Sequence, residues 1–155
     1  MWTSLPRAGF DTETTGINVV EDRIVTAAVV IQGGDREESY TWLADPGVDI
    51  PDGAAAIHGI TTSTAQRDGR SAPDVLEEIA EILARHMSGG YPVIAFNASY
   101  DFTLLENELA RYGLQTVAQR LGGRVYPVID PYFLDRHADR YRKGKRTLAH
   151  IAAHY

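Results

Sequence analysis

Two carboxylates, Asp11 and Glu13, stand one residue apart in a short segment that starts at Gly9 and has apolar flanks. The segment reads as a buried β-strand, in which alternate residues point to the same face. Two like charges on one face of a core strand repel each other and are costly to bury. A divalent cation held by carboxylate oxygens would neutralise them, and exposure of a frayed strand end to solvent would also relieve the repulsion. The pair therefore predicts either a metal site or a solvated strand end.

The spacing of apolar residues in the rest of the chain predicts both helices and strands. A helix is predicted over 73–87, where apolar residues recur at helical spacing behind the start signals Ser71 and Pro73. Further helices are expected after Phe96, with Ser99 as its cap, after Pro131 and over 146–155. Strands are predicted over 9–14, 23–31, 38–43, 91–96 and 125–129. We expect an α/β fold with a mixed sheet of about five strands, because the first three strands suit a meander and the later ones alternate with helices.

Length and composition limit the class of protein. A chain of 155 residues is the size of one domain with a sizeable core. It has no cysteine, which excludes disulfides and thiolate metal sites. The first seven residues show no apolar signal region, and the apolar run over 24–31 is far too short to span a bilayer. We therefore expect a cytoplasmic protein without a membrane partner.

The net charge of −6 excludes a broad basic surface for gripping duplex nucleic acid. The charge is unevenly distributed, because six of the fifteen basic residues fall between Arg136 and Arg146. This cluster suits contacts with phosphates. It equally suits a solvated helix end and loop, in which Asp135 and Asp139 dilute the positive charge.

A third carboxylate, Asp101, falls just after the fourth predicted strand, in the first turn of the next helix. Binding sites in open α/β sheets form at the carboxyl ends of strands. A single acid in a first turn also stabilises a helix by about 0.3–1 kcal/mol through the helix dipole. Asp101 becomes a candidate ligand through its combination with Asp11 and Glu13.

Four segments together resemble one family in the same order along the chain. The segments are 11–16 (DTETTG), 57–61 (IHGIT), 97–101 (NASYD) and 128–130 (VID). From about residue 8 to its end, the chain resembles the DEDD-type 3′→5′ exonucleases, the group of the proofreading epsilon subunit of bacterial DNA polymerase III. The resemblance implies a ribonuclease H-like fold with a five-stranded mixed sheet and helices on both sides.

The resemblance also implies a catalytic site. The family holds two Mg²⁺ or Mn²⁺ ions with four carboxylates, and Asp11, Glu13 and Asp101 match three of them. Two such ions clamp a scissile phosphate, activate water and stabilise the leaving 3′ oxygen. The family often has an acid five residues before its loop histidine, where this chain has Gly53. Residues that match positions around the terminal nucleotide are Thr14, Thr15, Gly16 and His58.

The last family motif, a general-base histidine followed by the fourth acid, has no match before Tyr155. We therefore interpret residues 1–155 as a single exonuclease domain truncated before that motif. His150 and His154 have helical spacing with no acid after them, so they are interpreted as helix-face residues. Asp130 follows a strand and precedes a proline, which favours a capping or turn role over a metal ligand.

The expected function is metal-dependent hydrolysis at single-stranded DNA 3′ ends, which releases nucleoside monophosphates during proofreading or repair. A DNA polymerase is a possible partner. One alternative is an RNA-trimming exoribonuclease or oligoribonuclease of the same superfamily, which would recognise the 2′-hydroxyl. The other is a non-catalytic nucleic-acid-binding module that has kept the fold.

Overall fold

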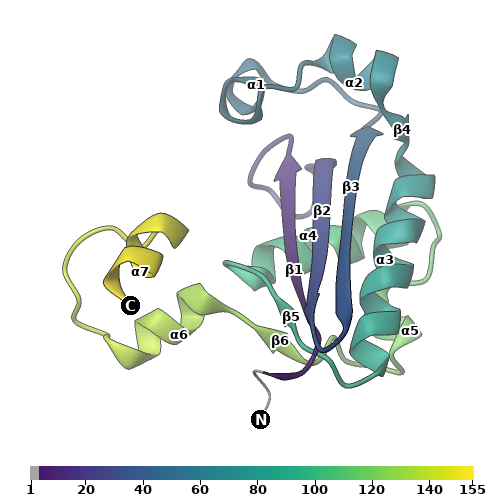
Figure 1. The fold of residues 1–155 in the computed structure, drawn as a ribbon. Helices are drawn as coiled ribbons and strands as arrows, with labels where there is room; N and C mark the ends of the chain where they lie inside the picture. Colours follow the sequence, from purple (N-terminus) through teal and green to yellow (C-terminus); the bar gives the residue numbers. More distant parts are fainter. Residues whose placement is uncertain (1–3) are drawn as a thin grey trace.

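A mixed β-sheet forms the centre of the computed structural model, which describes residues 4–155. Residues 1–3, at the start of the segment without a signal pattern, lie outside the described residues. The sheet has the order β4-β3-β2-β1-β5-β6, with β1 to β3 antiparallel and the other pairs parallel (Figure 1). Its strands are β1 (Arg7–Thr14), β2 (Ile24–Gly33), β3 (Arg36–Asp45), β4 (Arg70–Ser71), β5 (Val93–Ile94) and β6 (Val128–Ile129).

The predicted α/β class and mixed sheet are confirmed. The five predicted strands are present, and the sixth, β4, is a two-residue strand that pairs with the end of β3 at Ala44 and Asp45. Strands β5 and β6 are shorter than predicted, with two residues each. Strand β5 pairs with β1 only at Ala8 and Gly9, so the C-terminal half of β1 pairs with β2 and has no strand partner on its other edge within the described part of the chain.

Helices α3, α4 and α5 pack on one side of the sheet, whereas α6 and α7 lie apart from the strands and α1 and α2 lie beyond the strand ends (Figure 1). The segment of α1 and α2 forms two short helices although the sequence patterns predict no helix there. No helix within residues 4–155 is both long and apolar enough to cross a membrane. The bounds are α1 (Asp52–His58), α2 (Thr62–Asp68), α3 (Ala72–Ser88), α4 (Ala98–Arg111), α5 (Val117–Arg120), α6 (Pro131–Ala138) and α7 (Leu148–His154).

The main core lies between the sheet and α3 and α4. Alternation along β1 buries Ala8 and Phe10, while Gly9 and Asp11 are exposed. The Phe10 ring meets Phe102 of α4 with centroids 5.4 Å apart. Fully buried leucines of both helices, such as Leu83 of α3, complete this layer. The contact with Phe102 places the first turn of α4 beside the middle of β1.

The start of α4 differs from the sequence prediction. Ser99 lies inside the helix, and the N-cap is Asn97, whose backbone is left-handed (φ 57°) and whose side chain makes no capping bond. Asp130 takes the capping role, because its carboxylate accepts from the backbone N–H groups of Asn97 (3.0 Å) and Ala98 (2.9 Å). The same carboxylate accepts from Tyr132 N–H at the start of α6. The predicted capping role of Asp130 is confirmed and extends to two helices.

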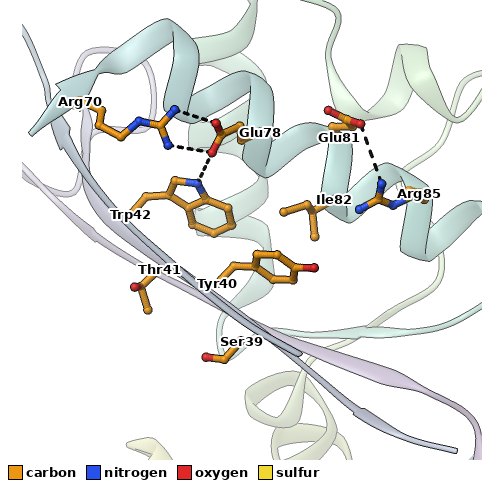
Figure 2. A pocket seen from close by; sticks show the side chains of 9 residues that line it. All are labelled: Ser39, Tyr40, Thr41, Trp42, Arg70, Glu78, Glu81, Ile82 and Arg85. Carbon is orange, nitrogen blue, oxygen red and sulfur yellow. Dashed lines mark hydrogen bonds and ion pairs between the residues drawn. The ribbon is translucent and has the colours of Figure 1, made fainter. Parts of the chain in front are cut away.

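Helix α3 is tied to the sheet edge through Glu78 (Figure 2). The Glu78 carboxylate accepts from Trp42 Nε1 of β3 at 2.8 Å and from both terminal nitrogens of Arg70. These bonds, with Arg70 as the larger cause, lower the pKa of Glu78 to about 2. The folded state therefore favours the ionised carboxylate.

Helix α4 also holds the connection between β1 and β2. Asn107 and Arg111 donate to the carbonyls of Val19 and Val20. Glu108, whose side chain is 1% exposed, accepts from Ile24 N–H at 2.6 Å. Burial raises the pKa of Glu108 to about 7, although the Ile24 N–H and the charge of Arg23 act in the opposite direction.

We predict that Glu78→Gln makes the protein less sensitive to acid. A carboxylate with a lowered pKa stabilises the fold above its unfolded pKa near 4.5, and this contribution is lost as the pH falls toward about 2. Chemical denaturation between pH 5 and pH 2 should show a shallower loss of unfolding free energy in the variant. Glu81→Gln is the matched control, because Glu81 lies on the same helix with a 4.0 Å contact to Arg85. Equal slopes in the two variants would contradict the prediction.

We predict the opposite pH trend for Glu108. The folded protein retains the Glu108 proton up to about pH 7, whereas the unfolded chain loses it near 4.5, so stability falls as the pH rises between these values. Wild-type unfolding free energy should fall by on the order of 3 kcal/mol between pH 4.5 and 8, as measured by urea denaturation, and Glu108→Gln should remove this fall. Glu37→Gln, at an exposed carboxylate, should leave the decline intact. A wild-type profile without this decline would refute the assignment.

Candidate active site

The site lies where β1 ends, between the turn after it and the first turn of α4. Asp11 and Glu13 belong to β1, and Asp101 belongs to α4. Thr14, Thr15 and Gly16 form the start of the β1–β2 connection, with a register shift at Glu13/Thr14. The structure therefore places the main sequence-predicted residues at one end of one strand and one helix.

Asp101 meets β1 through Thr12. Thr12 Oγ1 donates to Asp101 Oδ1 at 2.6 Å. Strand alternation puts Thr12 on the face of Phe10, toward α4, and puts Asp11 and Glu13 on the other face. Within residues 4–155, no three or more Asp, Glu or His side chains are grouped closely enough to hold a metal ion. The structure thus brings Asp101 to the strand that carries Asp11 and Glu13 without closing a three-carboxylate cluster.

The Asp101 carboxyl is 4% exposed. Burial raises its pKa to about 6, and the negative charge of Asp11 adds to the rise, while the bond from Thr12 opposes it. The influence of Asp11 shows that the two carboxyls are electrostatic neighbours. No basic side chain contributes to this shift, so the negative charge here is uncompensated by the protein.

Tyr100 and Thr14 together hold the turn after β1. Thr14 Oγ1 and Tyr100 OH are 2.7 Å apart, and both reach the carbonyl of Gly16. Burial raises the pKa of Tyr100, so its hydroxyl stays protonated and can donate at neutral pH. Tyr100 precedes Asp101 in the chain, so one turn of α4 contacts both the strand and the turn.

Asp22 is a structural residue of this turn that the sequence reasoning did not identify. Its carboxylate accepts from Thr15 Oγ1 (2.8 Å) and from Asn18 N–H (2.7 Å). A Cβ on Gly16 would lie 2.5 Å from Asp22 Oδ2, so any larger residue would displace this carboxylate from its hydrogen bonds. The glycine thus serves the closure of the loop itself. An acid six residues after a Thr-Gly pair, in a polar loop, was the available signal.

His58 ends α1, where Gly59 adopts a left-handed conformation (φ 79°). His58 Nδ1 accepts from Ile60 N–H at 3.1 Å, which fixes the neutral tautomer with its proton on Nε2. Nε2 is buried and has no hydrogen-bond partner within residues 4–155. His58 therefore combines a hydrogen bond to the backbone with a donor that is available to a ligand.

His150 takes part in helix capping and lies outside the site. Its Nδ1 lies 2.5 Å from the hydroxyl of Thr147, the N-cap of α7. This agrees with its interpretation as a helix-face residue. His154 packs edge-on against Tyr155 at the end of the same helix.

The donor set suits hard divalent cations. Carboxylate oxygens without thiols or a tight histidine pair are the ligands that Mg²⁺ and Mn²⁺ favour. The buried and uncompensated charge at Asp101 is the structural feature that a bound cation would neutralise. The residues present are therefore of the chemical type that binds such ions. A bound ion would have to span the distance between Asp101 and the strand face that carries Asp11 and Glu13.

Comparison with known proteins adds to this geometry. An exonuclease family model named RNase_T matches residues 8–155, which is nearly the whole chain. Among curated relatives, the PolC-type DNA polymerase III of Bacillus subtilis is 34% identical over 97 residues, covering 62% of this chain and 6% of that protein. The exonuclease DPD1 of Arabidopsis thaliana is 30% identical over 162 residues, covering 85% of this chain and 49% of that protein. The chain thus spans half or less of these relatives.

Solved structures of exonuclease I show the same fold. One superposes with a TM-score of 0.76 at 18% identity, covering 96% of this chain and 35% of that chain. The Escherichia coli exonuclease I in complex with a dA16 oligonucleotide gives a TM-score of 0.74 at 17% identity, with 96% and 35% covered. The sheet order of this chain and its superposition on exonuclease I confirm the predicted ribonuclease H-like fold. The chain belongs to the exonuclease family of the RNase_T model.

Proposed function

We propose that this protein is a divalent-metal-dependent 3′→5′ exonuclease that removes nucleoside monophosphates from single-stranded DNA ends. The observation that carries the proposal is the placement of Asp101, which is buried against Thr12 on β1, the strand that also carries Asp11 and Glu13. A buried carboxyl without a cationic partner, at the edge of a structured turn and on the strand of two further acids, suits a phosphate-cleaving metal site.

The metal ligands we propose are Asp11, Glu13 and Asp101, and the ions are Mg²⁺ or Mn²⁺. When bound, such ions supply charge stabilisation at the scissile phosphate and lower the pKa of an attacking water. The chain's own contribution is positioning. Thr12 fixes the orientation of the Asp101 carboxyl, and Tyr100 fixes the turn that borders it.

Thr14, Thr15, Gly16 and His58 are the proposed contacts of the terminal nucleotide. Thr15 is buried and bonded to Asp22 and Arg23, so it acts by shaping the turn. The unpartnered Nε2–H of His58 is a donor suited to a phosphate or sugar oxygen. Ile17, next to Gly16, is 92% exposed and offers an apolar surface for a base.

DNA is the proposed substrate because several relatives are DNA polymerases by name and one exonuclease I structure holds a DNA oligonucleotide. Association with a DNA polymerase is a further part of the proposal and has the same support. An RNA-trimming activity and a purely binding role are the alternatives that the experiments below separate.

We predict that the full-length natural protein releases mononucleotides from a 3′ end only when Mg²⁺ or Mn²⁺ is present. Asp11→Asn and Asp101→Asn should each lower the rate at least about 100-fold, because even indirect partners of metal ligands affect metal binding by 10–100-fold. The measurement is chromatography of the products from matched 5′-labelled DNA and RNA oligomers.

The control for these variants is Asp45→Asn at the end of β3, which should retain wild-type activity. Asp22→Asn is unsuitable for this purpose, because the Asp22 carboxylate shapes the turn beside the site. Faster cleavage of RNA would replace the DNA assignment by the RNA-trimming alternative. Oligomer binding with no cleavage in any divalent metal would favour the binding module and overturn the proposal.

We also predict that Tyr100 is a positioning residue for the turn. Tyr100→Phe removes the hydroxyl that meets Thr14 and Gly16, which should lower kcat/KM for a DNA oligomer by about three- to tenfold. The loss should lie mainly in KM, because the turn holds substrate and not the reacting atoms. Tyr112→Phe, at the other end of α4, is the matched control. Equal kinetics in both variants would show that the Tyr100 hydroxyl has no such role.

A further inference from the structure

A large groove opens beside the site, on the side of α6. It has a volume of about 1130 Å³, and its wall on the site side contains Ser99, two residues before Asp101. Asp130 joins the two walls, because its carboxylate accepts from backbone N–H groups at the start of both α4 and α6. The opposite wall carries Tyr132, Phe133, Arg136 and Arg140. We call this feature the α6 groove.

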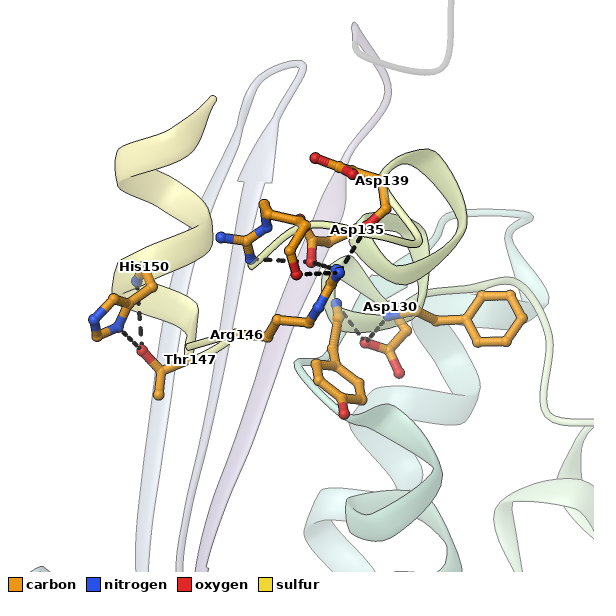
Figure 3. A network of polar contacts seen from close by, with 9 residues as sticks. Asp130, Asp135, Asp139, Arg146, Thr147 and His150 are labelled. Atoms are coloured by element: carbon orange, nitrogen blue, oxygen red, sulfur yellow. Dashed lines mark hydrogen bonds and ion pairs between the residues drawn. The ribbon is translucent and has the colours of Figure 1, made fainter. Parts of the chain in front are cut away.

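Two arginines of the α6 groove are used by the fold itself. Arg142 and Arg146 both pair with Asp135, which is 2% exposed, and Arg146 also donates to the carbonyl of Asp139 (Figure 3). Although burial acts in the opposite direction, these two guanidinium groups lower the pKa of Asp135. The pairing keeps the segment between α6 and α7 close to α6, so these arginines are a scaffold. They correct the sequence interpretation of the basic cluster as a wholly solvated helix end.

Arg136 and Arg140 have a different status. Both are exposed, and within residues 4–155 neither takes part in an ion pair. The Arg136 guanidinium lies 5.7 Å from the centroid of the Tyr132 ring, and that of Arg140 lies 6.0 Å from Tyr141. The Phe133 ring, 58% exposed, lines the same groove and meets the His137 ring with centroids 4.1 Å apart. One groove thus presents two cations without an ion pair together with aromatic side chains.

Positive charge is concentrated in the part of the chain that forms the α6 groove. Residues 131–155 carry six basic and two acidic side chains, a net charge of +4. Residues 1–130 carry nine basic and nineteen acidic side chains, a net charge of −10. The Asp130 carboxylate, which lines the groove, accepts from backbone N–H groups, and the charge of Asp135 is neutralised by two arginines. A polyanion would therefore find attraction at this groove and repulsion over most of the remaining surface.

We propose that the α6 groove binds single-stranded nucleic acid, namely the part of the strand that lies 5′ of the nucleotide at the site. This inference rests on the proposed function for the direction of the strand. Arg136 and Arg140 contact phosphates, and Phe133 and Tyr132 offer faces on which bases stack. Bases are available for stacking only in a single strand, and a duplex would bring its second backbone toward the acidic surface. The groove extends substrate contact beyond the terminal nucleotide.

The test is the binding of 5′-fluorescein-labelled oligo(dT) of 4, 8 and 12 nucleotides to the full-length natural protein in EDTA, followed by fluorescence anisotropy. The double variant Arg136→Gln/Arg140→Gln should bind the 12-mer about tenfold more weakly at 0.1 M salt. Its plot of log affinity against log salt should be shallower by about 1.4, the value for two phosphate contacts to a single strand. Phe133→Ala should weaken binding about fivefold or more without changing the salt slope.

The matched control is Arg67→Gln/Arg85→Gln, which removes the same charge at exposed arginines paired with Asp68 and Glu81. It should bind like the wild type. Thermal midpoints of all variants report whether each still folds. Equal affinities in the two double variants, or a wild-type protein that does not bind the 12-mer, would overturn the proposal.

A second readout separates this proposal from the proposed function. The p-nitrophenyl ester of thymidine 5′-monophosphate occupies only the terminal-nucleotide site, so the Arg136→Gln/Arg140→Gln variant should hydrolyse it at the wild-type rate. If the wild type fails to hydrolyse the ester in Mn²⁺ but the anisotropy results hold, the proposed activity fails and the groove assignment stands. If the double variant loses ester hydrolysis while remaining folded, these arginines act at the site and the groove assignment fails.

Discussion

The contact between the first turn of α4 and β1 is the interaction on which the rest of the site depends. Three consecutive residues of this turn each make a different contact: Tyr100 with the turn after β1, Asp101 with Thr12, and Phe102 with Phe10. The aromatic contact buries apolar surface and brings the two polar contacts into place. Farther along the helix, Glu108 accepts from Ile24 N–H at the start of β2. One helix therefore positions the strand, the acid and the loop together.

The charges of two buried acids, Asp135 and Asp101, are compensated to different degrees. Asp135 forms ion pairs with Arg142 and Arg146, which lower its pKa. These ion pairs hold the segment between α6 and α7 in place. Asp101 accepts from the Thr12 hydroxyl and from backbone groups but faces no guanidinium within residues 4–155, and burial raises its pKa. An acid that the fold leaves uncompensated carries a cost in stability. A bound cation would remove that cost, which is why Asp101, and not Asp135, belongs to the proposed site.

Much of the fold was predictable from residue periodicity. Apolar flanks identified β1, richness in Ile, Val and Ala identified β2, and the apolar stripe with its Ser71 cap identified α3. Helices α1 and α2 were missed, because their sequences are short, rich in alanine and threonine, and flanked by Pro51 and glycines without an apolar stripe. The cap of α4 was assigned to Ser99 in place of Asn97, since the side chain that satisfies the helix start is Asp130, more than thirty residues away.

Local spacing alone is enough to place Asp11 and Glu13 on one face of a strand and to show four motifs in the order of an exonuclease family. That Asp101 reaches β1 from the face of Thr12 follows from the packing of α4 against the sheet and from no local pattern. Tertiary packing also binds Arg142 and Arg146 to Asp135, while Arg136 and Arg140 remain free for a ligand. Spacing fixes the direction of a side chain on its own element, but its partners come from distant segments that meet only when the core packs.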